Sequence, residues 1–251
     1  MHTLRIVIIG NGSVAEGLAR EFGEAGVGGD AWLVQQWARK THSPEELAEA
    51  DLYVLAVSDG AVGEVSGTLP FAAGSVVAHT AGCVPLEGIS SRIVHRAVLY
   101  PLQSFTRGRR QADFRRTPFF IEGATPHALS TVRRAAGTIS DSVAEMSSER
   151  RARIHLAGAF ANNFSNAMLS LAGQIASDAG ETFDALRPIV AETFAKALDM
   201  PSPEDAQTGA AQRGDRTIQA RHLEILAETH PELITMYKEI SDRIWRISKR
   251  N

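Results

Sequence analysis

The chain contains 251 residues, with 26 Lys and Arg against 29 Asp and Glu and a formal net charge of −3. This near balance argues against a nucleic-acid-binding protein, which usually carries a clear basic excess. Cys83 is the single cysteine, so no intramolecular disulfide can form and a reducing cytoplasm is the expected location. No apolar run approaches the roughly 18–20 residues of a membrane helix, and the first residues lack the cleavage region of a signal peptide. We therefore expect neither nucleic acid nor a membrane as a partner.

The first half of the chain alternates predicted strands with predicted helices. Short apolar runs, typical of strands covered on both faces, occupy residues 4–9, 32–37, 52–57 and 75–79, and weaker candidates lie at 98–100 and 118–122. A helix is predicted from Val14 to about Gly26, because Val14, Leu18 and Phe22 recur at a spacing of four residues. A shorter helix is predicted over about 61–69. This alternation favours a parallel sheet with right-handed crossovers.

The turn after the first predicted strand has the glycine pattern of a dinucleotide-binding site. Gly10 permits the tight turn, Gly12 lets the backbone approach a pyrophosphate, and Ala15 lets helix and strand pack closely. The following helix N-terminus presents free N–H groups and a positive partial charge to phosphates. The predicted cofactor contacts in this turn are Gly10, Asn11, Gly12, Ser13, Val14 and Ala15. The alternative is that the glycines serve only a tight turn in a fold that has lost its ligand.

Residues at the carboxyl end of the second predicted strand favour NADP(H) over NAD(H). NAD sites usually place an acidic residue there, whereas this chain has Arg39, Lys40 and Thr41. Two cations and a hydroxyl suit the 2′-phosphate of NADP(H). The alternative is that Arg39 and Lys40 form a solvated surface pair. Further cofactor contacts are predicted at the ends of later strands, from Val57, Ser58, His79 and Gln103.

From about residue 128 the sequence predicts helices in place of strands. They cover residues 128–139, 148–179, 183–198, 217–228 and 231–249. The predicted architecture is α/β, with a Rossmann-like dinucleotide-binding domain over residues 1–147 and an all-helical domain over residues 148–251. Ligand clefts often form where two such domains meet.

Several motifs spread over both halves of the chain occur together. They are Gly10-x-Gly12-x-x-Ala15 and the segments 56–59, 79–82, 100–105, 155–164 and 207–215. With these motifs the chain resembles the bacterial Rossmann-like proteins that have a C-terminal domain of unknown function. That group is similar in layout to pyrroline-5-carboxylate reductase, ketopantoate reductase and the 6-phosphogluconate dehydrogenase-like superfamily. The resemblance spans nearly the whole chain and implies an NADP-linked oxidoreductase. It also implies that the helical domain builds the substrate site and a homodimer interface.

One feature departs from those relatives. Many 6-phosphogluconate and hydroxyacid dehydrogenases carry a lysine one helical turn before an asparagine on the first long helix. Four residues before Asn162 and Asn163, this chain has Gly158 and Ala159. The usual acid/base assignment therefore cannot be transferred.

Three side chains are predicted to be catalytic: His79, Lys196 and Asn163. Hydride transfer needs orientation and a group that handles the substrate proton. His79 ends a predicted strand at the edge where ligands dock, although it can equally cap the following turn. Lys196 can protonate the substrate, or it can pair with Glu192 four residues earlier. Asn163 can bind the substrate or form a hydrogen bond between helices.

Substrate contacts are predicted from Asn163, Thr208 and Arg213. Arg213 can hold a carboxylate with two parallel hydrogen bonds, or it can pair with Asp215 and organise the loop. No metal site is expected, because the histidines are scattered without a helical ligand spacing.

The sequence thus predicts an NADP(H)-dependent oxidoreductase that transfers a hydride to or from a small, anionic metabolite. The alternative is a non-catalytic NADP-binding or interaction protein that has lost the usual catalytic lysine. An enzyme using another redox partner, such as a deazaflavin, is a third possibility.

Overall fold

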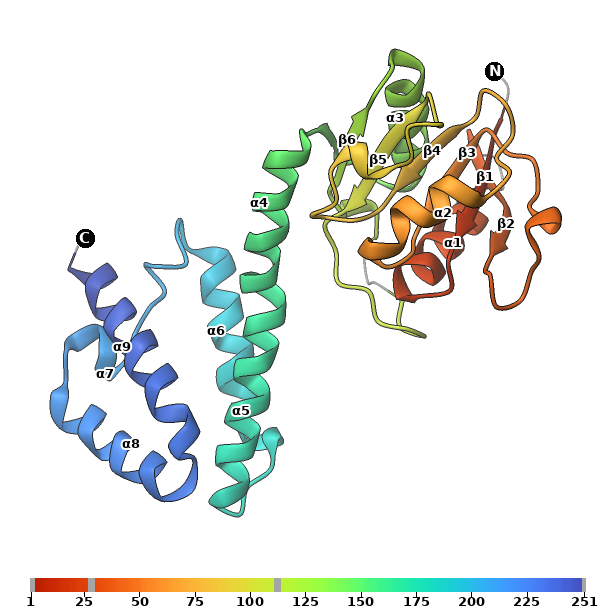
Figure 1. The fold of residues 1–251 in the computed structure, drawn as a ribbon. Coiled ribbons are helices and arrows are strands. Elements are labelled where there is room, and N and C mark those ends of the chain that lie inside the picture. The colour runs from red at the N-terminus through yellow and green to blue at the C-terminus, as the bar shows by residue number, and fades with distance from the viewer. Residues whose placement is uncertain (1–2, 27–29, 111–113, 250–251) are drawn as a thin grey trace. The chain divides into compact units, whose positions relative to one another are not determined.

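The computed structural model describes residues 3–26, 30–110 and 114–249 (Figure 1). The strands are β1 (Leu4–Ile9), β2 (Ala31–Trp37), β3 (Leu52–Leu55), β4 (Val76–His79), β5 (Arg96–Pro101), β6 (Phe119–Gly123) and β7 (Val143–Glu145). The α-helices are α1 (Ser13–Ala25), α2 (Val62–Thr68), α3 (Pro126–Ile139), α4 (Ser148–Gly158), α5 (Ser165–Asp178), α6 (Arg187–Asp199), α7 (Ala210–Arg213), α8 (Arg216–Thr229) and α9 (Ile234–Ser248). A π-helix spans Ala159–Phe164, and short 3-10 turns lie at Pro44–Glu46, Asp59–Ala61, Leu86–Gly88, Phe114–Arg116, Phe183–Leu186 and Pro231–Leu233.

The strands form a single mainly parallel sheet in the order β2-β1-β3-β4-β5-β6-β7. Each neighbouring pair is parallel except β5 and β6, which are antiparallel. The predicted Rossmann-like fold class is therefore confirmed. Strand β7, which follows α3 directly, was not among the predicted strands.

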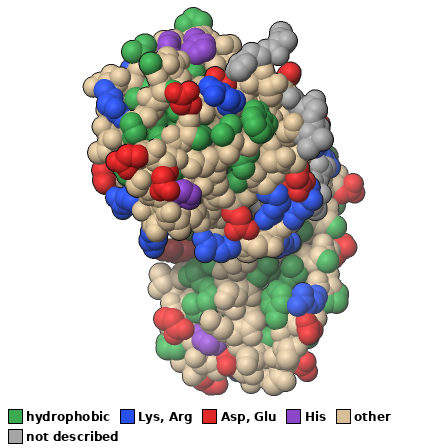
Figure 2. All heavy atoms as spheres, turned by 90° about the vertical axis from the view of Figure 1, so that its right-hand side faces the viewer, with side chains coloured by type: hydrophobic (Ala, Val, Ile, Leu, Met, Phe, Trp, Pro, Cys, Tyr) green, Lys and Arg blue, Asp and Glu red, His purple; other side chains and the backbone are tan. Residues whose placement is uncertain are grey.

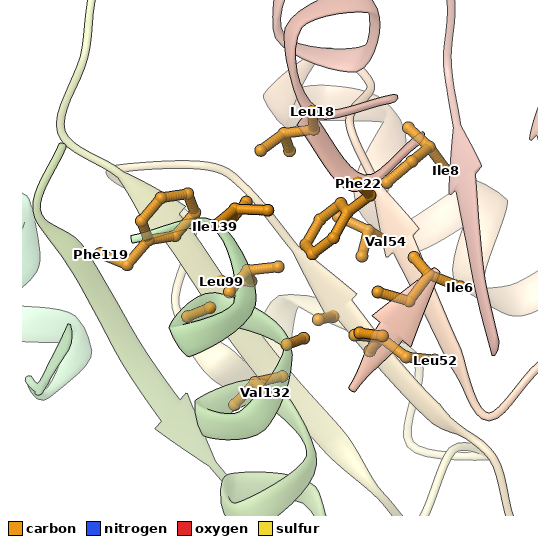
Figure 3. Close-up of a cluster of buried hydrophobic side chains, with 14 of the residues drawn as sticks. Ile6, Ile8, Leu18, Phe22, Leu52, Val54, Leu99, Phe119, Val132 and Ile139 are labelled. Carbon is orange, nitrogen blue, oxygen red and sulfur yellow. The ribbon is translucent and has the colours of Figure 1, made fainter. Parts of the chain in front are cut away.

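Both faces of the sheet are buried. Successive residues of its strands point to opposite sides, and each side packs into its own apolar cluster. Ile6 and Ile8 of β1 pack with Phe22 of α1 and with the apolar side of α3, as Figure 3 shows. Val7 and Ile9 point the other way, into a second cluster that includes side chains of α2. Unbroken apolar runs such as residues 4–9 are the sequence signature of this double burial.

Helix α4 continues through the π-helix Ala159–Phe164 into α5. The Ser147 side chain caps the start of α4 by accepting a hydrogen bond from the backbone N–H of Arg150 at 3.5 Å. Contacts divide the chain into one compact unit over Met1–Phe164 and another over Ser165–Asn251. The predicted domain boundary at residues 147/148 lies where the strands end and helix α4 begins, and it stays a prediction.

The second unit consists of helices. Gly214, with φ of +70°, ends α7, and a Cβ atom at this residue would lie 2.6 Å from the Trp245 ring of α9. Large apolar side chains of α6 remain exposed, among them Ile189 and Leu198, which are 65% and 86% exposed. Helix α7 falls within residues 207–215, which the sequence analysis did not predict to be helical.

Candidate functional site

A cavity of about 650 Å³ opens at the carboxyl ends of the parallel strands in the first unit. Strand β1 lies between β2 and β3, so the winding of the sheet reverses beside it. Open α/β sheets bind ligands at such a switch point. The cavity is lined by residues 10–14 after β1, residues 37–40 at the end of β2, and residues that follow β3 and β4.

The glycine turn has the geometry that the sequence predicts for it. Gly10 has φ of +139°, and a Cβ atom there would lie 2.2 Å from the carbonyl oxygen of Ala56. Gly12 is the N-cap of α1 and has no side chain to satisfy the first N–H groups, and an added Cβ would meet nothing within 4 Å. Ala15 is fully buried beneath the turn. The start of α1 therefore presents N–H groups to an open space that suits an anion.

The end of β2 brings two cations to the cavity. Arg39 and Lys40 both line it. The Arg39 guanidinium lies 3.2 Å from the carboxylate of Glu64, which also lines the cavity, and both side chains are largely exposed. Thr41 donates its hydroxyl to the carbonyl of Ala38 at 3.2 Å. The cations that are predicted to bind the phosphate therefore lie beside the carboxylate of Glu64.

Three other predicted cofactor contacts lie on the same cavity. Val57 and Ser58 line it at the end of β3, and Gln103 lines it beyond β5. The Gln103 side chain donates to the Thr117 hydroxyl at 3.3 Å and accepts from the backbone N–H of Ser104 at 2.8 Å. The amide nitrogen and the amide oxygen of Gln103 are therefore both hydrogen-bonded to other residues of the first unit.

His79 is fully buried at the end of β4 and is not among the cavity-lining residues. Its Nδ1 accepts a hydrogen bond from the backbone N–H of Ala81 at 3.1 Å, so its Nε2–H donates to the carbonyl of Pro85 at 3.3 Å. Burial, reinforced by the charge of Arg151, lowers the pKa of His79 to about 4. The ring therefore organises the backbone of the 79–85 turn, and the predicted proton-donor role would require it to give up one of these bonds.

This burial predicts an acid-sensitive fold. The unfolded chain takes up a proton at His79 below its ordinary pKa of 6.5, whereas the folded chain does so only below about 4. The stability that neutral His79 contributes is present above pH 6.5 and is lost as the pH falls to 4, by about 3 kcal/mol in total. We expect urea unfolding of His79→Gln to show a shallower loss of stability across this window than the parent chain. An equal slope in both proteins would contradict the burial of neutral His79.

A pair that the sequence analysis did not assign to the site lies at the same cavity. The Tyr100 hydroxyl of β5 and Nδ1 of His155 on α4 are 3.0 Å apart, and both residues line the cavity. Tyr100 belongs to the motif at residues 100–105 and His155 begins the motif at residues 155–164, so the two side chains are 55 residues apart in the sequence. The period of α4 alone does not indicate which strand it packs on, so the pairing becomes visible only in three dimensions.

The remaining predicted residues fall in different parts of the chain. Asn163 lies in the π-helix of the first unit and is exposed. Lys196 lines a hollow of the second unit that is formed by α6. Thr208 precedes α7 and Arg213 is its last residue, while the Asp215 carboxylate caps α8 by accepting from the N–H of Ile218 at 3.1 Å. The shared substrate-binding role of these residues stays a prediction.

Within the described residues there is no group of three or more His, Cys, Asp or Glu side chains placed to hold a metal ion. No helix in the described part of the chain is both long and apolar enough to cross a bilayer. Figure 2 shows acidic and basic side chains interspersed on the visible face, which among the described residues carries no broad area of one charge.

Sequence comparison places part of the chain in a known family. The family model for a domain of unknown function, DUF2520, matches residues 117–244. This match confirms the resemblance found in the sequence. No curated protein matches the chain.

Solved structures share the whole fold. A protein from Bacteroides fragilis described as a putative NADP oxidoreductase is 29% identical, with a TM-score of 0.85 and coverage of 97% of this chain and 98% of that one. The 1-pyrroline-5-carboxylate reductase of Streptococcus pyogenes is 13% identical, with a TM-score of 0.63 and 99% coverage of both chains. A reductive aminase from Aspergillus terreus, solved with NADPH and ethyl levulinate, is 14% identical, with a TM-score of 0.67 and 98% coverage of both chains. At these last two identities the likeness concerns the fold alone.

Proposed function

We propose, from the premise that this chain belongs to the DUF2520 family, that it is an NADP(H)-dependent oxidoreductase acting on a small, anionic metabolite. The observation that carries the proposal is the open glycine turn at the switch point of the sheet, with two cations at the end of β2. The description of the Bacteroides fragilis protein and the NADPH bound to the reductive aminase support the same cofactor. When bound, NADP(H) supplies or accepts the hydride.

The residues present fit such a cofactor. The backbone N–H groups of Ser13 and Val14, with no side-chain cap at Gly12, are available to a diphosphate. A side chain at Gly12 would enter the space in front of the helix, which the glycine leaves open. Asn11, Val57, Ser58 and Gln103 are proposed to contact the rest of the cofactor along the cavity wall.

The phosphate end is proposed to lie at Arg39 and Lys40. Both cations line the cavity and are long enough to reach a 2′-phosphate. Thr41 follows them in the sequence, and its hydroxyl, which donates to the carbonyl of Ala38, would have to turn to the phosphate. Glu64 opposes this role because it pairs with Arg39 and repels a phosphate. The affinity for NADPH is then set by the balance between the two cations and this carboxylate.

Substrate is proposed to meet Asn163, Lys196, Thr208 and Arg213, in keeping with the resemblance. Lys196 and Arg213 supply positive charge for an anionic group, and Asn163 an amide that can donate and accept. We further propose that residues 148–251 form the substrate domain and a homodimer interface, which the exposed apolar side chains of α6 support. The expected location is the cytoplasm.

The proposal is tested by calorimetric titration with NADPH and NADH at one fixed salt concentration. We expect the parent chain to prefer NADPH. The double variant Arg39→Ala/Lys40→Ala should weaken NADPH binding about tenfold or more, because charge-assisted hydrogen bonds to the phosphate are lost, while NADH binding changes little.

Glu64→Gln is the matched variant with the opposite expected effect, because it removes a negative charge beside the proposed phosphate site and not a positive one. It releases Arg39 from an exposed ion pair worth roughly 0.2–1 kcal/mol, so NADPH binding should strengthen about two- to fivefold without a change for NADH. If neither nucleotide binds the parent chain, the proposed function is wrong. If NADPH binds but no carbonyl or imine is reduced, the non-catalytic alternative, which Gly158 and Ala159 motivate, takes its place.

A further inference from the structure

A tyrosine and a histidine meet at the wall of the cavity. Tyr100 is 7% exposed, and its hydroxyl lies 3.0 Å from Nδ1 of His155. Their rings meet edge to face with centroids 5.9 Å apart. Thr80, Gly82 and Gln103 line the same cavity as this pair, as do the glycine turn and Arg39. The pair therefore shares one binding space with the proposed cofactor contacts.

The close approach of His155 depends on Gly82. A Cβ atom at Gly82 would lie 2.3 Å from Nδ1 of His155 and 2.8 Å from its Cβ. The backbone of Gly82 does not adopt a positive φ, so the requirement at this residue is for space and not for conformation. Any side chain at residue 82 would push the imidazole away from Tyr100.

The environment keeps a proton on the phenol. Burial raises the pKa of Tyr100, and negative charge at Cys83 and Asp59 acts in the same direction, against the opposing charge of Arg151. His155 differs from Tyr100 in its burial, because His155 is exposed to solvent. The pair thus joins a buried phenol that holds its proton to an imidazole in contact with solvent.

His79 is the residue of the first unit that was predicted to donate a proton to the substrate, but its ring is already engaged by the backbone. Both ring nitrogens of His79 are occupied by the backbone of the 79–85 turn. Nε2 of His155 has no partner among the described residues, whereas its Nδ1 faces Tyr100. A proton can enter at Nε2 and leave at Nδ1, which is the path of a relay.

We infer that Tyr100 is the residue that donates a proton to the substrate, and that His155 positions the phenol and restores its proton. This inference rests on the proposed function and narrows its substrate to a carbonyl or a neutral imine. Asn163 then serves substrate binding.

The proton and electron balance of the step is simple. As a hydride adds to the carbon of C=O or C=N, the electron pair of the double bond moves to the oxygen or nitrogen. That atom forms a bond to the Tyr100 proton as the phenolic O–H bond breaks. The phenolate oxygen takes the Nδ1 proton of His155 while Nε2 takes a proton from water, which leaves the ring as its Nε2–H tautomer. Loss of the Nε2 proton to water and uptake of a proton at Nδ1 restore the starting tautomer before the next turnover. The reverse sequence serves oxidation of an alcohol or amine.

The first arm of the test is nitrogen NMR of the histidine-labelled chain saturated with NADP⁺, which needs no substrate. The relay requires a proton on Nδ1 of His155, because the phenol must keep its own hydrogen for the substrate. We expect Nδ1 of His155 to be protonated in the parent chain. In Tyr100→Phe the preference of the ring for the Nδ1–H tautomer over the Nε2–H tautomer should be lost. A bare Nδ1 in the NADP⁺ complex would overturn the inference.

The second arm follows NADPH oxidation with glyoxylate as the carbonyl probe. Tyr100→Phe, which keeps the ring, should lower kcat about 10²- to 10⁴-fold with an unchanged Kd for NADPH. His155→Gln and Gly82→Ala should lower kcat in the same direction through the lost or displaced imidazole. Tyr237→Phe is the matched control, because Tyr237 forms a similar hydrogen bond to His222 at 2.9 Å on the second unit.

The outcomes separate the two proposals. If Tyr100→Phe binds NADPH and retains the parent kcat, the relay is wrong while the proposed function stands. If the parent chain fails to bind NADPH, the proposed function fails first. Equal losses in Tyr100→Phe and Tyr237→Phe would indicate a general structural effect and would overturn the assignment of Tyr100.

Discussion

Replacing Gly10 by alanine is expected to destabilise the first unit by about 2–6 kcal/mol and to remove nucleotide binding with it. Gly10 has φ of +139°, which an alanine adopts only under strain. The new Cβ atom would also lie 2.2 Å from the carbonyl oxygen of Ala56, a backbone atom that cannot turn away as a side chain can. Urea unfolding measures the loss as a lower midpoint at an unchanged slope.

Gly12→Ala is the informative control two residues later. Its Cβ atom meets nothing within 4 Å, so the cost to folding is about 1 kcal/mol or less, as for an N-cap that becomes alanine. NADPH binding should nevertheless weaken at least tenfold, because the methyl group occupies the proposed place of the diphosphate. Unchanged affinity in Gly12→Ala would place the diphosphate elsewhere.

The contrast between these two glycines shows what a sequence can predict. The strand at residues 4–9 and the turn that follows it are local patterns, and both are confirmed at the predicted positions. The roles of Gly10 and Ala15 also follow from short-range geometry, because a tight strand-to-helix turn leaves little freedom. Fold class was predictable for the same reason: apolar runs buried on both faces occur mainly in parallel sheets.

Features that depend on packing between distant parts of the chain could not be predicted from the sequence in the same way. Strand β7 has three residues, which is too short for a periodic signal, and its place beside β6 depends on tertiary contacts. His79 ends a strand as predicted, yet its ring turns into the fold and bonds to the backbone. Tyr100 and His155 are 55 residues apart, and their contact depends on how α4 is anchored to the sheet.

That anchor is Arg151, and its removal is the second large effect that we expect. The side chain is fully buried, with one guanidinium nitrogen 2.7 Å from the Glu122 carboxylate of β6 and another 2.5 Å from the carbonyl of Val84. Ser148 joins the network by donating to the same carboxylate at 2.6 Å. Arg151→Met should cost about 3–5 kcal/mol of unfolding free energy, because Glu122 keeps a charge that has lost its buried partner.

A cycle of variants separates this charge effect from simple loss of packing. Arg151→Met/Glu122→Gln should recover much of the stability, since removing both charges leaves no unpaired ion in the interior. Arg153→Ala is the matched control on the same helix. Its exposed ion pair with Glu149, at 2.6 Å, should contribute about 0.3–0.5 kcal/mol. If Arg151→Met costs no more than Arg153→Ala, Glu122 is hydrated when unpaired, and α4 must be held on the sheet by its apolar contacts alone.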